Sequence, residues 1–257
     1  MVTLRSGDKL PNPASALRSV PALVESLGSS GTGAASRVLR HRNGAKFLVG
    51  GDPLDRKILA EMHGRYAALY FPEGLDRIPP EAWILDVGAH RGFFATAIIQ
   101  HCPGARVIAV EPDPIAMAAL QANIALNGFE GRTETVEAGL GECDGYGYLL
   151  RSNQGSWSNH LTADPCHGNV VRVRIVRLSS ILRDRRPYVV KCNAEGGEFH
   201  LLPQLFQLAA HPAIIILMAH PEAGPVNELL ALLLREGYHL TPIQSSPIHP
   251  RYVCRLS

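Results

Sequence analysis

Residues 84–113 constrain the fold of this chain more than any other segment. An apolar run over 84–87 breaks at the glycine-containing stretch 88–92, and a helix-like stretch then leads to a second apolar run that ends at Glu111. This order predicts a strand, a tight turn, a helix and a second strand, as in an open α/β sheet. Ligands of such sheets bind beyond the carboxyl ends of the strands, where an acid can accept both hydroxyls of a ribose. The segment predicts a site for a nucleoside-containing cofactor; a strand, turn and helix without a ligand is the alternative.

The spacing of the glycines distinguishes between cofactors. A dinucleotide fingerprint reads G-x-G-x-x-G and places a pyrophosphate at a helix N-terminus. Here three residues separate Gly88 from Gly92, position 90 is histidine, and Asp86 adds negative charge where phosphates would lie. The pattern therefore disfavours NAD-dependent oxidoreduction. It favours S-adenosylmethionine, whose amino-acid end carries an ammonium group.

Strand-like and helix-like segments alternate from Trp83 onward. This alternation predicts an α/β fold with mostly parallel strands, right-handed crossovers and helices on both faces. The last two strands have no helix between them, so we expect them to pair antiparallel; residues 145–151 and 170–177 are expected to form a hairpin or sheet extension near the third strand. This is the Rossmann-like architecture of class I methyltransferases. We expect strands at 83–88, 105–111, 133–138, 171–177, 188–193, 213–219, 238–243 and 251–256, and helices at 92–101, 114–126, 198–210 and 225–236.

The N-terminal part divides into two segments before the main domain. Residues 1–35 are expected to be a flexible or helical extension, with a short amphipathic helix at 14–27 and a glycine-serine linker after it. Residues 36–80 are expected to form a hairpin around Asn43-Gly44 and a helix that begins at Pro53, both packed on the core. Residues 81–257 would then be the S-adenosylmethionine-binding methyltransferase domain.

Composition limits the partners and the compartment. A net charge of +2 is too small to indicate a nucleic-acid surface, and the arginines of 172–186 are interpreted as solvated positions. The five cysteines are widely spaced and the longest apolar run is too short to span a bilayer, so we expect a cytoplasmic protein without a membrane partner. His160, Asp164, Cys166 and His167 lack a second ligand pair, and no metal is expected.

Several separate segments resemble the FkbM-type family of S-adenosylmethionine-dependent methyltransferases. The resemblance covers about residues 60–240 and implies the class I fold and methyl transfer. Its members typically show D-V-G-A-N/H-x-G, E-P, N-x-x-x-N-G, K-x-D-x-E-G-x-E-F and I-E-x-H-P. The matching residues here are Asp86–Gly92, Glu111-Pro112, Asn123 with Asn127-Gly128, Lys191–Phe199 and Ile216–Pro221.

Two positions depart from the family pattern. Asn193 stands where the family usually has aspartate, and Met218 stands where it usually has glutamate. Both lie at the carboxyl ends of predicted strands, so the loss of both carboxylates puts in doubt any acid-base or cation-binding role that they share. With Asn193, an amine or amide acceptor becomes an option, because an amide oxygen can accept a hydrogen bond from N–H without abstracting a proton.

The cofactor and catalytic residues follow from these segments. Glu111 would hold the ribose, Pro112 and Asp113 would lie beside the adenine, residues 138–140 would border its other face or edge, and Asp86 would act through water and the ammonium group. A hydroxyl acceptor needs a base, because its proton must leave during attack. The candidates for catalysis are His220, Glu195, Asn193 and His160. Those for cofactor binding are Asp86, Gly88, Ala89, His90, Gly92, Glu111, Pro112, Asp113, Ala138, Gly139, Leu140 and Asn193.

The resemblance implies a small-molecule acceptor, with a hydroxyl favoured over an amine or amide, in secondary-metabolite or glycan tailoring. Two alternatives stay open: a methyltransferase that acts on RNA or protein, and a protein that binds the cofactor without turnover. The weak net charge argues against an RNA surface. A homodimer is also left open.

Overall fold

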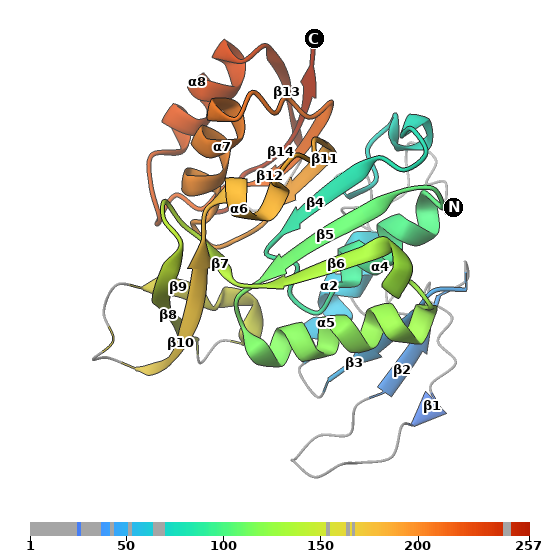
Figure 1. The fold of residues 1–257 in the computed structure, drawn as a ribbon. Coiled ribbons are helices and arrows are strands. Elements are labelled where there is room, and N and C mark those ends of the chain that lie inside the picture. Colours follow the sequence, from blue (N-terminus) through green and yellow to red (C-terminus); the bar gives the residue numbers. More distant parts are fainter. Residues whose placement is uncertain are drawn as a thin grey trace.

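The core of the protein is a seven-stranded sheet with the order β13-β14-β12-β11-β4-β5-β6 (Figure 1). The computed structural model describes residues 25–26, 37–41, 44–50, 53–63, 70–152, 155–162, 165, 168–243 and 248–257. Neighbouring strands from β12 to β6 run parallel. The strands are β4 (Trp83–Val87), β5 (Arg106–Glu111), β6 (Thr133–Glu137), β11 (Pro187–Cys192), β12 (Ile214–Met218), β13 (Tyr238–Ile243) and β14 (Arg251–Leu256). The predicted Rossmann-like sheet is confirmed.

β14 enters the sheet between β12 and β13 and runs antiparallel to both. Seven residues, 244–250, separate the two strands, which is too few for the crossover that a parallel strand would need, so the chain returns directly beside β13. The predicted antiparallel end of the sheet is therefore confirmed.

Helices cover both faces of the sheet, because alternate side chains of the central strands point to opposite sides. In β5, Val107 and Ala109 join one apolar cluster, whereas Ile108 and Val110 join the other. The first cluster lies under α4 (Phe93–His101) and α5 (Pro114–Asn127). The second lies under α6 (Leu178–Leu182), α7 (Glu198–Gln207) and α8 (Val226–Arg235). Short 3-10 helices occur at Leu75–Arg77, Glu130–Arg132 and Ser156–Ser158. Among the described helices, none has both the length and the apolarity that a membrane crossing requires.

A smaller four-stranded sheet extends from the end of β6, with the order β7-β10-β8-β9. It consists of β7 (Gly139–Leu140), β8 (Gly145–Arg151), β9 (His160–Thr162) and β10 (Asn169–Val176). β8 and β10 pair antiparallel with β9 between them in the chain, so of the predicted hairpin or sheet extension the structure has the extension, and β10 belongs to this second sheet and not to the main one. The reason is that β10 pairs on both sides with β7 and β8 and has no crossover helix after β6 to place it in the main sheet.

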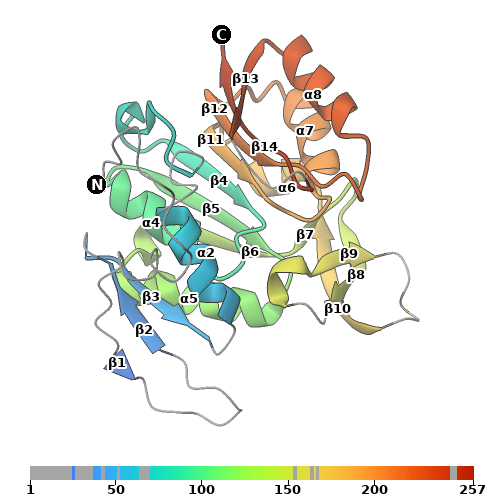
Figure 2. The same ribbon diagram turned by 180° about the vertical axis from the view of Figure 1, so that it is seen from behind.

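The N-terminal hairpin is present and packs on the same face as α4 and α5 (Figure 2). It consists of β2 (Arg37–Arg40) and β3 (Lys46–Val49), and helix α2 (Pro53–His63) follows and begins at the predicted proline. Of the helix expected at 14–27, the structure describes only Glu25 and Ser26, which form β1 and pair with the edge of β2 instead of being helical. Residues 1–24 lie outside the described part of the chain.

Candidate functional site

The glycines of the turn after β4 are required by close packing against neighbouring elements. Gly88 has a φ of +72°, and a Cβ added there would lie 1.9 Å from the backbone oxygen of Asn193. Gly92 has a φ of +71°, and its added Cβ would lie 2.8 Å from Cγ of Leu120. Glycines in such a turn let the backbone approach a ligand closely. The structure gives them an additional reason, which is the contact of the turn with the end of β11 and with α5.

Glu111 lies at the carboxyl end of β5 and is held by two backbone groups. The N–H of His90 donates to Oε2 at 2.8 Å, and the N–H of Asp113 donates to Oε1 at 2.9 Å. Burial raises the pKa of this carboxyl to about 7, and the two backbone hydrogen bonds offset only part of that effect. Each carboxylate oxygen can accept a second hydrogen bond, so the two hydroxyls of a ribose fit the remaining acceptor capacity.

Asp113 connects α5 to the segment after β8. Its Oδ1 accepts from the N–H of Ile115 as the N-cap of α5 and also lies 2.8 Å from Nη2 of Arg151. Its Oδ2 accepts from the Asn159 side chain at 2.8 Å. Asp113 was expected beside the adenine. Its side chain is buried in this network, where it holds the start of α5, Arg151 and Asn159 together.

The segment that Asp113 anchors also reaches the glycine turn. Nε2 of His90 lies 2.8 Å from Oγ of Ser156, so the side chain of the turn is hydrogen-bonded to residues 66 positions further along the chain. Ser156, Arg151 and Asn159 are site-forming residues that the sequence motifs did not indicate. The only sequence signal was the expectation of a hairpin near the third strand, which does not specify side-chain partners.

Asp86 is paired with a lysine inside the protein. Its side chain is 0% exposed and forms an ion pair of 2.8 Å with Nζ of Lys191 on β11. Lys191 also donates to the carbonyl of Gly88 at 2.7 Å. Burial lowers the pKa of the Lys191 ammonium, but Asp86 outweighs burial and the pKa is raised. Asp86 was expected to act through water and the ammonium group of the cofactor, and that role stays a prediction; in the structure, Asp86 and Lys191 together support the turn.

Residues 138–140 contribute mainly through their backbone. The N–H of Ala138 donates to the carbonyl of Glu111 at 3.2 Å, which places this segment beside the end of β5. The side chains of Ala138 and Leu140 are buried in the apolar cluster under α6 and α7. A Cβ on Gly139 would lie 2.7 Å from Leu161, so this glycine allows β9 to pack closely. Pro112, between Glu111 and Asp113, is half-buried, and Ala89 is buried with its N–H on the carbonyl of Val110.

Three of the ionisable residues form a buried cluster at the ends of β11 and β12. Nδ1 of His220 lies 2.8 Å from Oε1 of Glu198, and Nε2 lies 3.1 Å from Oε1 of Glu195. Glu198 Oε1 also accepts the backbone N–H of His220 at 2.7 Å, and its Oε2 accepts the N–H of Gly196 at 3.1 Å. From the sequence, Glu198 was a candidate base with a helix cap as the alternative; in the structure its side chain joins the two strand ends through His220 and Gly196.

The electrostatics of this cluster favour the protonated form of His220 and so disfavour a role as general base. Burial lowers the pKa of the imidazole, but the hydrogen bonds to Glu195 and Glu198 outweigh it and raise the pKa to about 9. The ring is 0% exposed and already carries its proton at neutral pH. Glu195, whose side chain is 17% exposed, is the member of the cluster that an acceptor can reach.

Asn193 joins the site and His160 does not. The backbone N–H of Asn193 donates to the carbonyl of Val87 at 3.1 Å, beside the glycine turn, and its Oδ1 is buried without a hydrogen-bond partner among the described residues. His160 is exposed on β9, and its ring contacts the carbonyl of Ser158 at 3.3 Å. Its expected catalytic role has no support in this placement, because the ring belongs to the surface of the small sheet.

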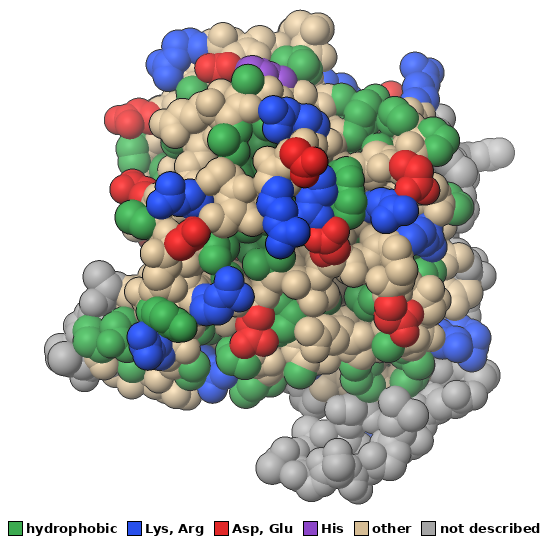
Figure 3. Space-filling model, in the orientation of Figure 1, with side chains coloured by type: hydrophobic (Ala, Val, Ile, Leu, Met, Phe, Trp, Pro, Cys, Tyr) green, Lys and Arg blue, Asp and Glu red, His purple; other side chains and the backbone are tan. Residues whose placement is uncertain are grey.

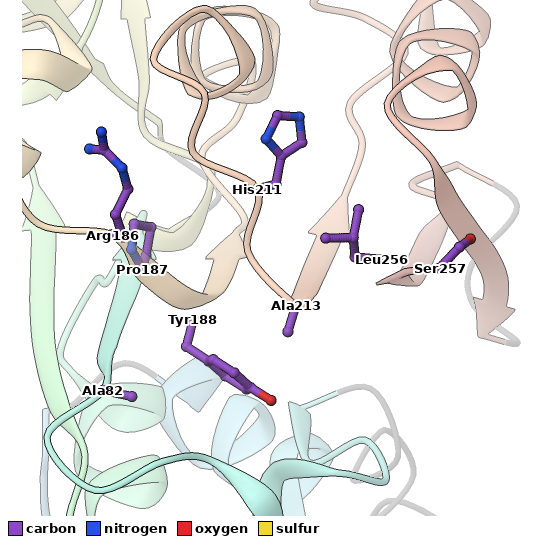
Figure 4. A pocket seen from close by; sticks show the side chains of 8 residues that line it. All are labelled: Ala82, Arg186, Pro187, Tyr188, His211, Ala213, Leu256 and Ser257. Carbon is purple, nitrogen blue, oxygen red and sulfur yellow. The ribbon is translucent and has the colours of Figure 1, made fainter.

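A cavity of about 420 Å³ lies at the amino ends of the strands of the main sheet, where β4, β11 and β12 begin. Figure 4 shows its lining, in which Tyr188 and His211 accompany smaller apolar side chains. Since ligands of parallel sheets bind at the carboxyl ends of the strands, this cavity is separate from the site around Glu111. In the part of the chain that the structure describes, no three His, Cys, Asp or Glu side chains are grouped as metal ligands; Asp164, Cys166 and His167 lie outside that part.

Comparison with known proteins finds methyltransferases among the relatives and the solved structures that resemble this chain. The methyltransferase sdnD of Sordaria araneosa is 27% identical over 200 residues, which are 64% of this chain and 76% of that protein. The crystal structure of methyltransferase FkbM from Methylobacillus flagellatus matches with a TM-score of 0.53 at 20% identity; the match covers 77% of this chain and 53% of that one. The profile of the methyltransferase FkbM domain matches residues 86–240, more than half of the chain. The chain therefore belongs to the FkbM family of methyltransferases.

Proposed function

We propose that the chain transfers a methyl group from S-adenosylmethionine to a hydroxyl of a small molecule. The observation that carries the cofactor assignment is Glu111, a buried carboxylate at the carboxyl end of β5 whose two oxygens each keep room for a second donor. The unpartnered Oδ1 of Asn193, on the other side of the glycine turn, supports a second polar contact. These acceptors fit a ligand with two vicinal hydroxyls and an ammonium group.

When bound, S-adenosylmethionine supplies a methyl group that is electrophilic because it is attached to a sulfonium. Glu111 would hold the ribose, and Asn193 would accept from the amino-acid ammonium. The turn from Gly88 to Gly92 would lie against the amino-acid end, with Lys191 neutralising the charge of Asp86 beneath it. The chain thus supplies binding and orientation, which can account for a large part of the rate enhancement of a methyl transfer.

The cluster of Glu195, His220 and Glu198 supports a hydroxyl acceptor. A hydroxyl must release one proton as its oxygen becomes an ether. Glu195 would accept it, since it is the exposed member, while His220 and Glu198 fix its position.

The charge distribution favours a small acceptor over RNA. On the face in Figure 3, Lys and Arg side chains are interspersed with Asp and Glu. In the arginine-rich segment, Arg177 pairs with Asp144 at 3.8 Å and Arg185 pairs with Glu134. RNA-binding surfaces present a basic patch without such neutralisation.

The test combines binding with turnover. Titration calorimetry with S-adenosylhomocysteine measures cofactor binding, and transfer from methyl-labelled S-adenosylmethionine is measured across hydroxylated small molecules, amines, RNA and protein. We expect label only on a hydroxyl. Label confined to RNA or protein would refute the acceptor class, and binding without transfer to any acceptor would indicate a binding protein.

Two variants test the roles at the acceptor end. Glu195→Gln removes the base, so kcat on the hydroxyl acceptor should fall by a factor of about 10² to 10⁴ while the affinity for S-adenosylhomocysteine stays the same. Glu222→Gln is the matched control, because Glu222 is an exposed carboxylate just after the end of β12. An unchanged kcat in Glu195→Gln would refute the role of Glu195. Asn193→Asp tests the amine option; if it leaves the acceptor preference unchanged, Asn193 does not select the acceptor.

A further inference from the structure

The turn from Gly88 to Gly92 is fixed from outside the sheet as well as from within it. Nε of Arg91 forms an ion pair with Oδ1 of Asp55 on α2, at 3.1 Å. The Asp55 side chain is 0% exposed, and its Oδ2 accepts the N–H of Gly50 at 2.6 Å. A Cβ on Gly50 would lie 3.0 Å from Nη1 of Arg91, so the chain before α2 packs directly on the guanidinium. The N-terminal segment therefore holds a side chain of the turn.

A second contact ties the same segment to the backbone of the turn. The side chain of Asn123 on α5 donates to the carbonyl of Arg91 at 2.8 Å, and its Oδ1 accepts the N–H of Leu48 on β3 at 2.5 Å. Asn127, one helical turn further on, makes the equivalent pair of bonds to Lys46, at 2.8 and 2.7 Å, without reaching the turn. The family motif N-x-x-x-N thus has a physical role, which is to dock β3 on α5.

His90 needs such external support. Its φ of +50° is in the left-handed region, which is unfavourable for a residue with a side chain. In this conformation its N–H donates to Glu111. If the neighbouring Arg91 were free, His90 could relax toward negative φ and withdraw that N–H. The position of the ribose-binding carboxylate would then be less well defined.

We propose that Asp55 is a positioning residue of the cofactor site, which acts through Arg91 to hold His90 and Glu111 in place. Leu48, Gly50 and Asp55 on this basis support the cofactor site, although they lie outside the segment that matches the FkbM domain. The inference rests on the proposed function, since it concerns the affinity for the same cofactor.

The test is a double-mutant cycle on S-adenosylhomocysteine affinity. Asp55→Asn keeps the size of the side chain and an acceptor for Gly50 while it removes the charge. We expect its Kd to rise about tenfold and KM for S-adenosylmethionine to rise with it, with kcat changed by less than about twofold. Arg91→Gln should have the same effect, and the double variant Asp55→Asn/Arg91→Gln should be no weaker than either single variant. The double variant leaves no unpaired buried charge, so the affinity can be measured on it even if a single variant does not fold.

Asn127→Ala is the matched control, because it loosens β3 on α5 without touching the turn. It should lower the unfolding temperature and leave the Kd within about twofold of the wild type. Equal weakening of binding by Asn127→Ala and Asp55→Asn would overturn the inference, as would wild-type affinity in Asp55→Asn or additive effects in the cycle. Absence of binding by the wild-type protein would instead refute the proposed function itself.

Discussion

The affinity for S-adenosylhomocysteine should depend on pH through Glu111. Its carboxyl has a pKa raised to about 7 by burial, so about a tenth of the molecules carry the ionised group at pH 6 and about nine tenths at pH 8. Ribose hydroxyls donate to the ionised form. The Kd should therefore fall about tenfold between these pH values, a change of about 1.4 kcal/mol in binding free energy.

Glu111→Gln should remove this dependence. The amide cannot ionise, and its NH₂ cannot accept one of the two backbone N–H groups that Glu111 now binds. We expect a Kd that is flat from pH 6 to 8 and, at pH 8, about 10 to 100 times weaker than that of the wild type, from the loss of hydrogen bonds to a charged group. Glu137→Gln is the matched control, because Glu137 is the exposed partner of Glu111 on β6.

The same pKa predicts the stability of the protein without ligand. The folded-state pKa of about 7 is above the 4.5 of an exposed glutamate, so the neutral acid contributes stability that is complete below pH 4.5 and is lost as the pH rises through about 7. The loss amounts to about 3 kcal/mol in the free energy of unfolding. Titration calorimetry and urea unfolding at pH 4.5, 6, 7 and 8 measure both effects. A wild-type Kd that does not change between pH 6 and 8 would refute the reasoning, and wild-type affinity in Glu111→Gln would refute the role of Glu111 in ribose binding.

Two further predictions concern packing and the buried histidine. Gly88→Ala should destabilise the fold by more than about 3 kcal/mol and abolish binding, because its Cβ would lie 1.9 Å from the Asn193 carbonyl oxygen. Gly128 also has a positive φ but has nothing within 4 Å of an added Cβ, so Gly128→Ala should cost only about 1–2 kcal/mol. Urea unfolding compares the two variants, and equal losses of stability would contradict the packing argument. His220 has a folded-state pKa of about 9 against 6.5, so it contributes stability that is complete below pH 6.5 and is lost as the pH rises through 9, by about 3 kcal/mol in all. His220→Gln should lower the free energy of unfolding most at pH 6 and make it less dependent on pH. If the variant and the wild type show the same pH dependence between pH 6.5 and 9, the ring is neutral in the folded protein.

The main sheet was predictable because its signals are local. Apolar runs that end in glycine or an acid, with helix-length stretches between them, specify β4, β5, α4, α5, α7 and α8 to within a few residues. The short helix α6 was not predicted, because its five residues are too few for a periodic pattern. The start of α2 at Pro53 and the end of α5 before Gly128 follow from local backbone preferences of the same kind. The placement of β10 was harder, because the same strand pattern fits either sheet and only its partners decide between them.

The site was predictable as a place but not as a set of side-chain roles. The motifs brought Gly88, His90, Glu111 and Asn193 to one edge of the sheet, and the structure places them there. They could not show that Asp86 is neutralised by Lys191, since that pair joins residues more than 100 positions apart. A sequence pattern names a titratable group, whereas its charge depends on what surrounds it after folding.

The sequence by itself thus determined the order of most strands and helices, the edge of the sheet where a cofactor is expected, and the membership of the FkbM family. These depend on short-range periodicity and on motifs within single segments. Only the tertiary structure decided that His220 carries its proton and that Glu195 is the accessible acid of that cluster, because burial and ion pairs arise from elements that meet only in the fold. It likewise decided that Asp55 contacts Arg91, since no local pattern connects α2 with the turn after β4.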